Sequence, residues 1–172
     1  MNRPKYENAI LFFAERVRDL GRVKLNKLLY FADFDHFEKY GEAITGDVYL
    51  NHELGPVPSH IQDVLADMIR ERKVEVVSEP LIDFVRFRLK PLVPCRADAF
   101  APSEIEMLCS VVAKWGAHTA REIVMASHGE APWIATRKGE DIPYPLAYYR
   151  GKFGASEPDY DSERLASTTT AI

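Results

Sequence analysis

The sequence predicts an α+β domain that is predominantly helical, with about five to six helices around a central buried helix and a small antiparallel sheet. Apolar residues recur at three- and four-residue spacing in several stretches, as they do on one face of a helix. Residues 74–77 and 83–89 instead read as two strands, and the second alternates apolar and charged residues, so that one face meets water. The chain of 172 residues is long enough to bury a core without disulfides or metals.

The first two helices are predicted by the periodicity of the N-terminal residues. Apolar side chains recur from Tyr6 to Leu20, and Gly21 is expected to end this helix. A second helix is expected over about residues 23–40, with a leucine stripe on one side and aromatic residues in the remaining sectors. Because a helix that is apolar nearly all round is usually buried, the second helix is predicted to be the central one.

The later helices are predicted from capping boxes, in which Ser or Thr is followed three residues later by Glu or Gln. Such boxes begin at Ser59, Ser103 and Thr119, and each is expected to open a helix. Between the second helix and Ser59, turn residues flank a short apolar segment around residues 48–50, which indicates a loop or an edge strand.

The domain is expected to span residues 1–152. From residue 155 onward the chain has few apolar residues and no periodicity, so residues 153–172 are predicted to form a disordered tail, acidic at first and then rich in Ser and Thr. No stretch approaches the roughly 18 apolar residues of a membrane span, and the N-terminus lacks the apolar run of a signal peptide. The expected compartment is therefore the cytosol.

The formal net charge of −4 argues against a protein that mainly coats nucleic acid, since such domains are usually basic. The charge is unevenly distributed, because residues 1–32 hold seven bases and three acids, whereas residues 33–53 hold six acids and one base. Aromatic side chains are interleaved in the acidic segment. This pattern suits recognition of a basic protein partner, or else the aromatic residues belong to the core.

Five basic residues gather at the junction of the first two helices, opposed by Asp19: Arg16, Arg18, Arg22, Lys24 and Lys27. We expect them to form a solvated helix end, where cations are favourable. The alternative is a patch that faces nucleic acid, which would make the protein a DNA-binding regulator of its own operon.

No catalytic constellation is recognisable in the sequence. It contains no nucleophile elbow, no glycine-rich phosphate loop and no CxxC or HExxH pair of metal ligands. We therefore expect neither enzymatic activity nor a bound metal or cofactor. A metal-dependent hydrolase that uses Asp33, His36 and His128 remains the alternative, since Asp33 and His36 share one side of a helix.

Several short motifs follow one another at defined spacing: residues 24–33 (KLNKLLYFAD), Tyr40-Gly41, residues 44–47 (ITGD) with Tyr49, and residues 55–58 (GPVP). This succession resembles the Panacea antitoxin domain, the family of SocA-type antitoxins and phage-associated GepA-like proteins. Farther on, Ser127-His128, Pro132-Trp133 and residues 142–144 resemble the distal signature of the family. The resemblance covers about residues 5–150.

The resemblance implies a mainly helical domain that neutralises a cognate protein toxin by direct contact. In the SocA-type member the antitoxin is also an adaptor that delivers its bound toxin to the ClpXP protease. The expected partners are therefore a toxin and that protease, whereas nucleic acid and membranes are not expected partners.

Seven motif residues are polar or amphipathic and are expected to bind the partner: Tyr30, Asp33, Tyr40, Asp47, Tyr49, His128 and Trp133. Tyr and Trp often anchor interfaces, because they combine a large contact area with one hydrogen bond. His128 and Trp133 are alternatively expected to lock the last helix onto the central one. For Asp47→Lys and Tyr49→Ala we expect weaker binding with little change in the thermal midpoint.

Overall fold

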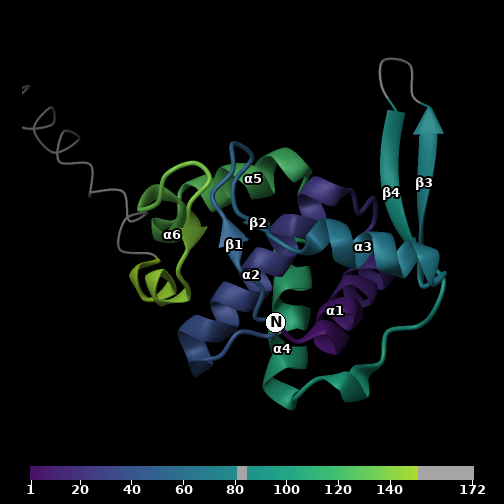
Figure 1. Cartoon of the computed structure of the whole chain (residues 1–172), viewed down its shortest axis with the longest axis horizontal. Coiled ribbons are helices and arrows are strands. Elements are labelled where there is room, and N and C mark those ends of the chain that lie inside the picture. Colours follow the sequence, from purple (N-terminus) through teal and green to yellow (C-terminus); the bar gives the residue numbers. More distant parts are fainter. Residues whose placement is uncertain (81–84, 151–172) are drawn as a thin grey trace, which may run out of the picture.

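The structure, a computed structural model of the chain, describes residues 1–80 and 85–150. Figure 1 shows helix α2 (Arg22–Tyr40) near the centre of the fold. The described residues contain five further α-helices. They are α1 (Arg3–Arg16), α3 (Ile61–Arg70), α4 (Pro102–Trp115), α5 (Ala120–His128) and α6 (Ala131–Ile134), with short 3₁₀ helices η1 (Ala97–Ala99) and η2 (Tyr144–Tyr149). The predicted class, a predominantly helical α+β domain, is confirmed.

Helix α2 is the centre of the core, as its pattern predicts. Its leucines Leu25, Leu28 and Leu29 are fully buried, and α1, α4, α5 and η2 all pack against it. The helix ends at Gly41, whose φ of 78° is the left-handed conformation that glycine adopts readily at helix ends.

Helix α1 is shorter than its periodicity predicts, because it ends at Arg16 and Val17 is already extended. Val17 and Leu20 are nevertheless buried, so the apolar pattern continues through a turn that is no longer helical. The carbonyl of Leu20 then accepts a hydrogen bond of 2.9 Å from the backbone N–H of Leu89, which ties this turn to the sheet region.

A three-stranded antiparallel sheet of two-residue strands has the order β2-β1-β5. Strand β1 (Tyr49–Leu50) pairs with β2 (Val57–Pro58) and with the distant β5 (Asp141–Ile142). The expectation of a loop or an edge strand around residues 48–50 is therefore wrong, since β1 is the middle strand. Its second neighbour comes from the far end of the domain, which no local pattern reveals.

The two predicted strands form an antiparallel hairpin of β3 (Val74–Pro80) and β4 (Val85–Pro91). The hairpin projects from the body of the molecule (Figure 1). Its alternation is confirmed, because the cross-strand pair Val76 and Leu89 lies on one face and the pair Glu75 and Lys90 on the other.

Only one of the three predicted capping boxes forms as expected. Thr119 caps α5, with its Oγ1 accepting from the Glu122 N–H and the Glu122 carboxylate accepting from the Thr119 N–H at 2.7 Å. Helix α3 instead follows His60, and α4 begins at Pro102. The hydroxyls of Ser59 and Ser103 contact Asp47 and His36 respectively, so tertiary partners displace the local caps.

Within residues 1–80 and 85–150, no helix combines the length and the apolar character needed to cross a membrane. The predicted tail at residues 153–172, and with it the domain boundary at residue 152, lies outside the described residues.

Candidate functional site

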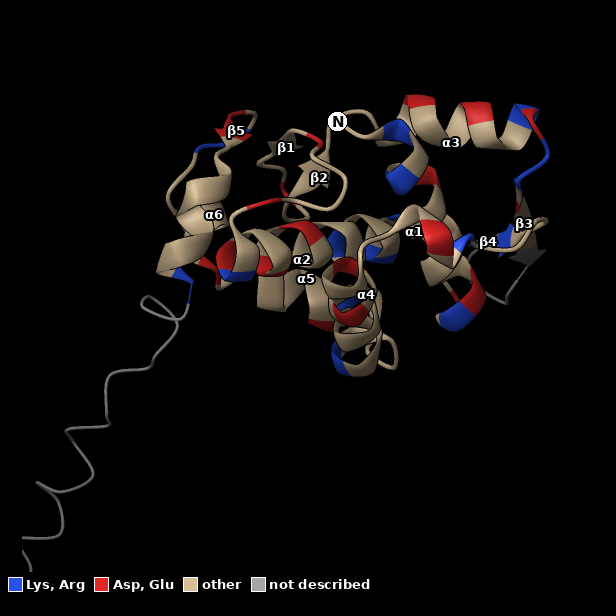
Figure 2. Ribbon diagram, turned by 90° about the horizontal axis from the view of Figure 1, so that it is seen from below, with Lys and Arg blue, Asp and Glu red and all other residues tan. Residues whose placement is uncertain are grey.

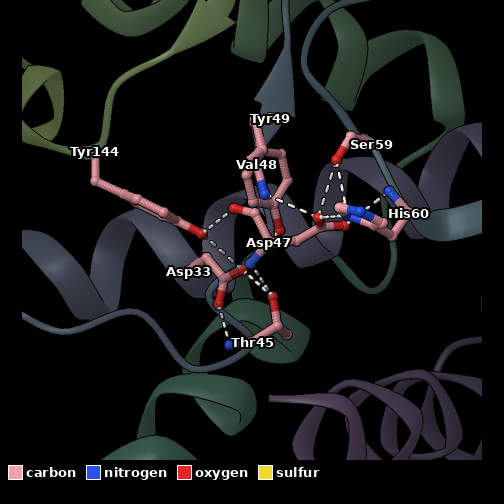
Figure 3. Close-up of polar contacts among 8 residues, drawn as sticks. All are labelled: Asp33, Thr45, Asp47, Val48, Tyr49, Ser59, His60 and Tyr144. Atoms are coloured by element: carbon pink, nitrogen blue, oxygen red, sulfur yellow. Dashed lines mark hydrogen bonds and ion pairs between the residues drawn. The ribbon is translucent and has the colours of Figure 1, made fainter. Parts of the chain in front are cut away.

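Asp33, in the middle of α2, holds the segment that connects α2 to β1. Its Oδ1 accepts a hydrogen bond of 2.7 Å from the Thr45 N–H, and its Oδ2 accepts from the hydroxyls of Tyr49, at 2.8 Å, and Thr45 (Figure 3). The carboxyl is completely buried, and this burial raises the pKa of Asp33 although the hydrogen bonds oppose the shift. The group therefore serves the packing of the connecting segment on the central helix.

Asp47 performs a second buried task, at the start of α3. Its carboxylate accepts hydrogen bonds from the backbone N–H groups of Val48, at 2.8 Å, and His60, at 3.1 Å, and contacts the Ser59 hydroxyl and the His60 ring (Figure 3). The first N–H groups of a helix lack partners within the helix, and a negative charge is favourable there. Asp47 thus fixes the residue that precedes α3, but no side-chain hydrogen bond caps this helix, so the cap predicted at Ser59 does not form.

Tyr144 of the distal signature joins the Asp33 carboxyl and the backbone of Asp47 to the C-terminal part of the domain. Its hydroxyl donates to the carbonyl of Asp47 at 2.7 Å and lies 3.3 Å from Oδ2 of Asp33 (Figure 3). Between Thr45 and Asp47, Gly46 has a φ of 66°, which lets the two neighbouring side chains serve different elements.

Tyr30 is buried and donates a hydrogen bond of 2.9 Å to the Glu130 carboxylate. The same carboxylate accepts from Nε and Nη2 of Arg150 at 2.6 and 2.7 Å, and the buried guanidinium also pairs with Asp35. Arg150 therefore fastens the end of η2 to α2 and to the start of α6. The sequence offers no signal for it, because it is an isolated arginine next to the predicted tail.

Lys27 is buried, and its Nζ donates to the carbonyl of Pro56 at 2.6 Å. Burial lowers the pKa of Lys27 to about 7. Gly55, with a φ of 83°, passes so close that a Cβ atom there would lie 2.4 Å from Oγ of Ser127 and 2.8 Å from Cε of Lys27. The proximal GPVP motif, the central helix and the distal Ser127-His128 motif thus meet at one point.

This position of Lys27 changes the interpretation of the predicted basic cluster. Lys24 is buried as well and donates to the carbonyl of Gly116 at 2.8 Å, at the C-terminal end of α4. Arg16 lies over the ring of Phe12 with 3.9 Å between guanidinium carbon and ring centroid. The expectation of a solvated helix end is therefore wrong for both lysines and holds for the exposed Arg16, Arg18 and Arg22.

His128 and Trp133 stack with ring centroids 4.1 Å apart, and Nε1 of Trp133 donates to the carbonyl of His52 at 3.1 Å. Burial lowers the pKa of His128. Together they hold the β1–β2 connection against α5 and α6, rather than locking a helix directly onto α2. Both rings are partly exposed.

A surface pocket of about 400 Å³ lies beside this stack and is lined by His52, Trp133 and Ile134, among others. Ile134 is 52% exposed and Leu54, in the same connection as His52, is 56% exposed. Helix α6 carries no charged residue and is uniformly tan in Figure 2. We call the surface formed by Leu54, His128, Trp133 and Ile134 the Trp133 face.

The seven residues expected to bind a partner thus divide by burial. Tyr30, Asp33, Asp47 and Tyr49 are buried, and their polar groups make internal hydrogen bonds. Tyr40, His128 and Trp133 reach the surface, Tyr40 at the end of α2, where its ring lies tilted against the ring of His36. The expectation that substitutions of Asp47 and Tyr49 leave the thermal midpoint unchanged does not fit their burial.

The residues of the hydrolase alternative do not come together. His36 contacts the Glu42 carbonyl through Nδ1 and the Ser103 hydroxyl through Nε2, Asp33 serves Thr45, and His128 lies on Trp133. In the part of the chain that the structure describes, no three His, Cys, Asp or Glu residues form a group that could hold a metal ion.

The family described as "Antitoxin SocA-like, Panacea domain" has a sequence profile that matches residues 25–134, more than half of the chain. The protein belongs to this family. The match confirms the resemblance and contains Asp33, Asp47, Lys27 and the Trp133 face, whereas Tyr144 and Arg150 follow it. No curated protein and no solved structure matches the chain.

Proposed function

We propose that this SocA-like protein is a cytosolic antitoxin that neutralises a cognate protein toxin by direct contact. The observation that carries the proposal is the family match over residues 25–134. The internal hydrogen bonds of the polar motif residues favour binding over catalysis, because Asp33, Asp47 and Lys27 each hold backbone segments together.

We place the toxin contact on the Trp133 face. It combines a pocket lined by the partly exposed Trp133 and the exposed Ile134 with the exposed Leu54, which follows the lining residue Glu53 in the chain. Such a group of apolar and aromatic residues with a polar rim is typical of interface centres. Of the seven residues expected to bind the partner, His128 and Trp133 belong to this face.

The experiment is co-expression with the product of the adjacent gene. If that product is the toxin, the wild-type chain restores growth and co-purifies with it. Leu54→Glu and Ile134→Glu should reduce co-purification, because each places a charge in an apolar contact. The matched control is Met125→Glu, which changes an exposed apolar residue of α5 outside the pocket lining. Absence of rescue and of co-purification with wild type would contradict the proposal.

We further propose that the protein acts as an adaptor that delivers its toxin to ClpXP, with residues 153–172 as the segment that engages the protease. The acidic, Ser/Thr-rich composition of this segment supports the role. Toxin turnover by purified ClpXP should be fast with the full chain and slow with a chain that lacks residues 155–172. Equal turnover would restrict the protein to simple inhibition.

A further inference from the structure

The β3–β4 hairpin has an apolar face that the body of the protein covers only in part. Cross-strand partners share a face, so Val74, Val76, Phe87 and Leu89 lie on the same side. Val74 and Leu89, near the base, are buried, whereas Val76 is 46% exposed and Phe87 is 59% exposed. The apolar core thus continues outward along the projecting hairpin and ends in solvent (Figure 1).

Phe87 also forms one wall of a groove of about 1200 Å³. The groove lies between the turn after α1, the start of α2, and the connection from α4 to α5. Val23 and Val112 add apolar surface to its lining. A groove with an apolar lining and an exposed aromatic residue at its edge is suited to receive the apolar side of a partner element.

The lining is strongly basic. Arg18, Arg22 and Arg121 are exposed there, and Asp19 is the one acidic residue that lines the groove among the described residues. Asp19 offsets part of this charge, with 4.0 Å to Arg18 and 3.5 Å to Arg88. The remaining positive charge surrounds an apolar wall, a combination that attracts an acidic partner with an apolar stripe.

We propose that this hairpin groove binds an acidic amphipathic helix of a protein partner, and we define the groove by Val23, Phe87, Val112, Arg18, Arg22 and Arg121. An α-helix presents apolar residues at three- and four-residue spacing and charged residues beside them. Its apolar stripe contacts Phe87 and the valines, and its carboxylates pair with the three arginines. The hairpin groove shares no lining residue with the Trp133 pocket, so this inference goes beyond the proposed toxin contact.

The probe is a fluorescent 20-residue helix-forming peptide with Leu at heptad core positions and Glu elsewhere, and its control carries Lys in place of Glu. The full-length protein should bind the Glu peptide and not the Lys peptide in anisotropy titrations. The double substitution Arg22→Glu with Arg121→Glu should weaken binding by at least about tenfold. Both residues lie in the first turn of a helix, where an acidic residue is favourable, so the variant is expected to fold.

Two single substitutions separate this surface from the Trp133 face. Phe87→Ser should weaken peptide binding, whereas Ile134→Ser removes a similarly exposed apolar side chain elsewhere and should leave it unchanged. Arg137→Glu is the matched charge reversal outside the groove and should have little effect. A loss of toxin co-purification in the Arg22→Glu, Arg121→Glu variant would identify the helix as part of the toxin, while retention would assign it to another protein.

The proposal is overturned if the wild-type chain does not bind the Glu peptide, if the variants bind it equally well, or if a DNA duplex binds more tightly. Two further results would overturn it in favour of another occupant. If the chain forms a dimer and Phe87→Ser abolishes the dimer, the groove binds a second copy of the chain. If neutralisation of Glu157, Asp159, Asp161 and Glu163 tightens peptide binding, the groove binds the chain's own C-terminal residues. None of these results affects the test of the Trp133 face, which is rescue of growth in the co-expression experiment. The two proposals can therefore fail independently.

Discussion

The segment between α2 and α3 and the β3–β4 hairpin attach to the same core in opposite ways. The segment holds polar residues that point inward, and Asp33 and Asp47 receive hydrogen bonds from backbone and hydroxyl groups there. The hairpin holds apolar residues that point outward, and Phe87 is uncovered. In this domain polar motif residues therefore build the architecture, whereas exposed apolar residues form the surfaces that we propose for binding.

The largest effect is expected for Asp33→Ala. The substitution leaves the Thr45 N–H and the hydroxyls of Thr45 and Tyr49 buried without an acceptor, at a cost of about 3–5 kcal/mol in the free energy of unfolding. Urea denaturation measures this cost. Asp33→Asn keeps the volume and one acceptor oxygen and should lose less stability. A loss below about 1 kcal/mol for Asp33→Ala would contradict the architectural role of this carboxyl.

The second prediction tests the point where the motifs meet. Gly55→Ala should cost about 2–4 kcal/mol, because its Cβ overlaps Oγ of Ser127 and Cε of Lys27 at a φ that already disfavours alanine. The control is Gly139→Ala, at a φ of 86° with no atom within 4 Å of the new Cβ, which should cost only about 1–2 kcal/mol. Equal losses of stability would mean that the close approach at Gly55 has no energetic weight.

The third prediction concerns pH. Burial lowers the pKa of Lys27 from 10.5 to about 7. Between these two values the unfolded chain binds a proton that the folded chain does not, so the stability of the wild type should rise with pH by up to about 1.4 kcal/mol per unit. Below pH 7 both states are protonated at Lys27, and its contribution to the slope vanishes.

Lys27→Met should flatten this rise in stability between about pH 7 and 10 in urea titrations. His128 is the titratable neighbour, and its pKa is lowered by burial and by the charge of Lys27, so its own titration affects stability at lower pH. The matched control is Lys90→Met, which removes an exposed lysine of the hairpin and should keep the slope. A slope that survives Lys27→Met would assign the pH dependence to other groups.

The smallest effect on stability is expected on the hairpin. Phe87→Ser should change the free energy of unfolding by about 0.5 kcal/mol or less, because the ring is mostly in solvent. The same variant is expected to weaken binding of the acidic peptide, so that one substitution would lower binding while leaving stability nearly unchanged. A loss comparable to that of Asp33→Ala would place Phe87 in the core.

Local signals in the sequence predict local features of the fold correctly. The periodicity of α2 identifies the central helix, and the capping box at Thr119 identifies the start of α5, because both partners of that cap lie within one turn. The capping box at Ser59 does not form, since the N-cap of α3 is His60 and the Ser59 hydroxyl instead donates to Asp47, twelve residues away in sequence.

The candidate site is predicted less well, because burial of a polar residue depends on partners that are distant in sequence. Lys27 and Lys24 read as surface charges, although each finds a backbone carbonyl in the interior, at Pro56 and Gly116. From the sequence Tyr49 is expected at an interface, but in the structure its hydroxyl donates to the buried carboxyl of Asp33. The motifs indicated the right family and the right segments. Whether each motif residue is buried or exposed could be seen only in the structure.

The contacts of Arg150 have a mechanical consequence. A pulling force applied to the chain beyond residue 150, as a protease motor would exert it, reaches this residue before η2 or β5. The guanidinium holds Glu130 in two hydrogen bonds and pairs with Asp35 on α2, so the load passes directly into the central helix. The contacts of Arg150 with Glu130 and Asp35 must therefore break before a force from the C-terminal side can unfold the domain.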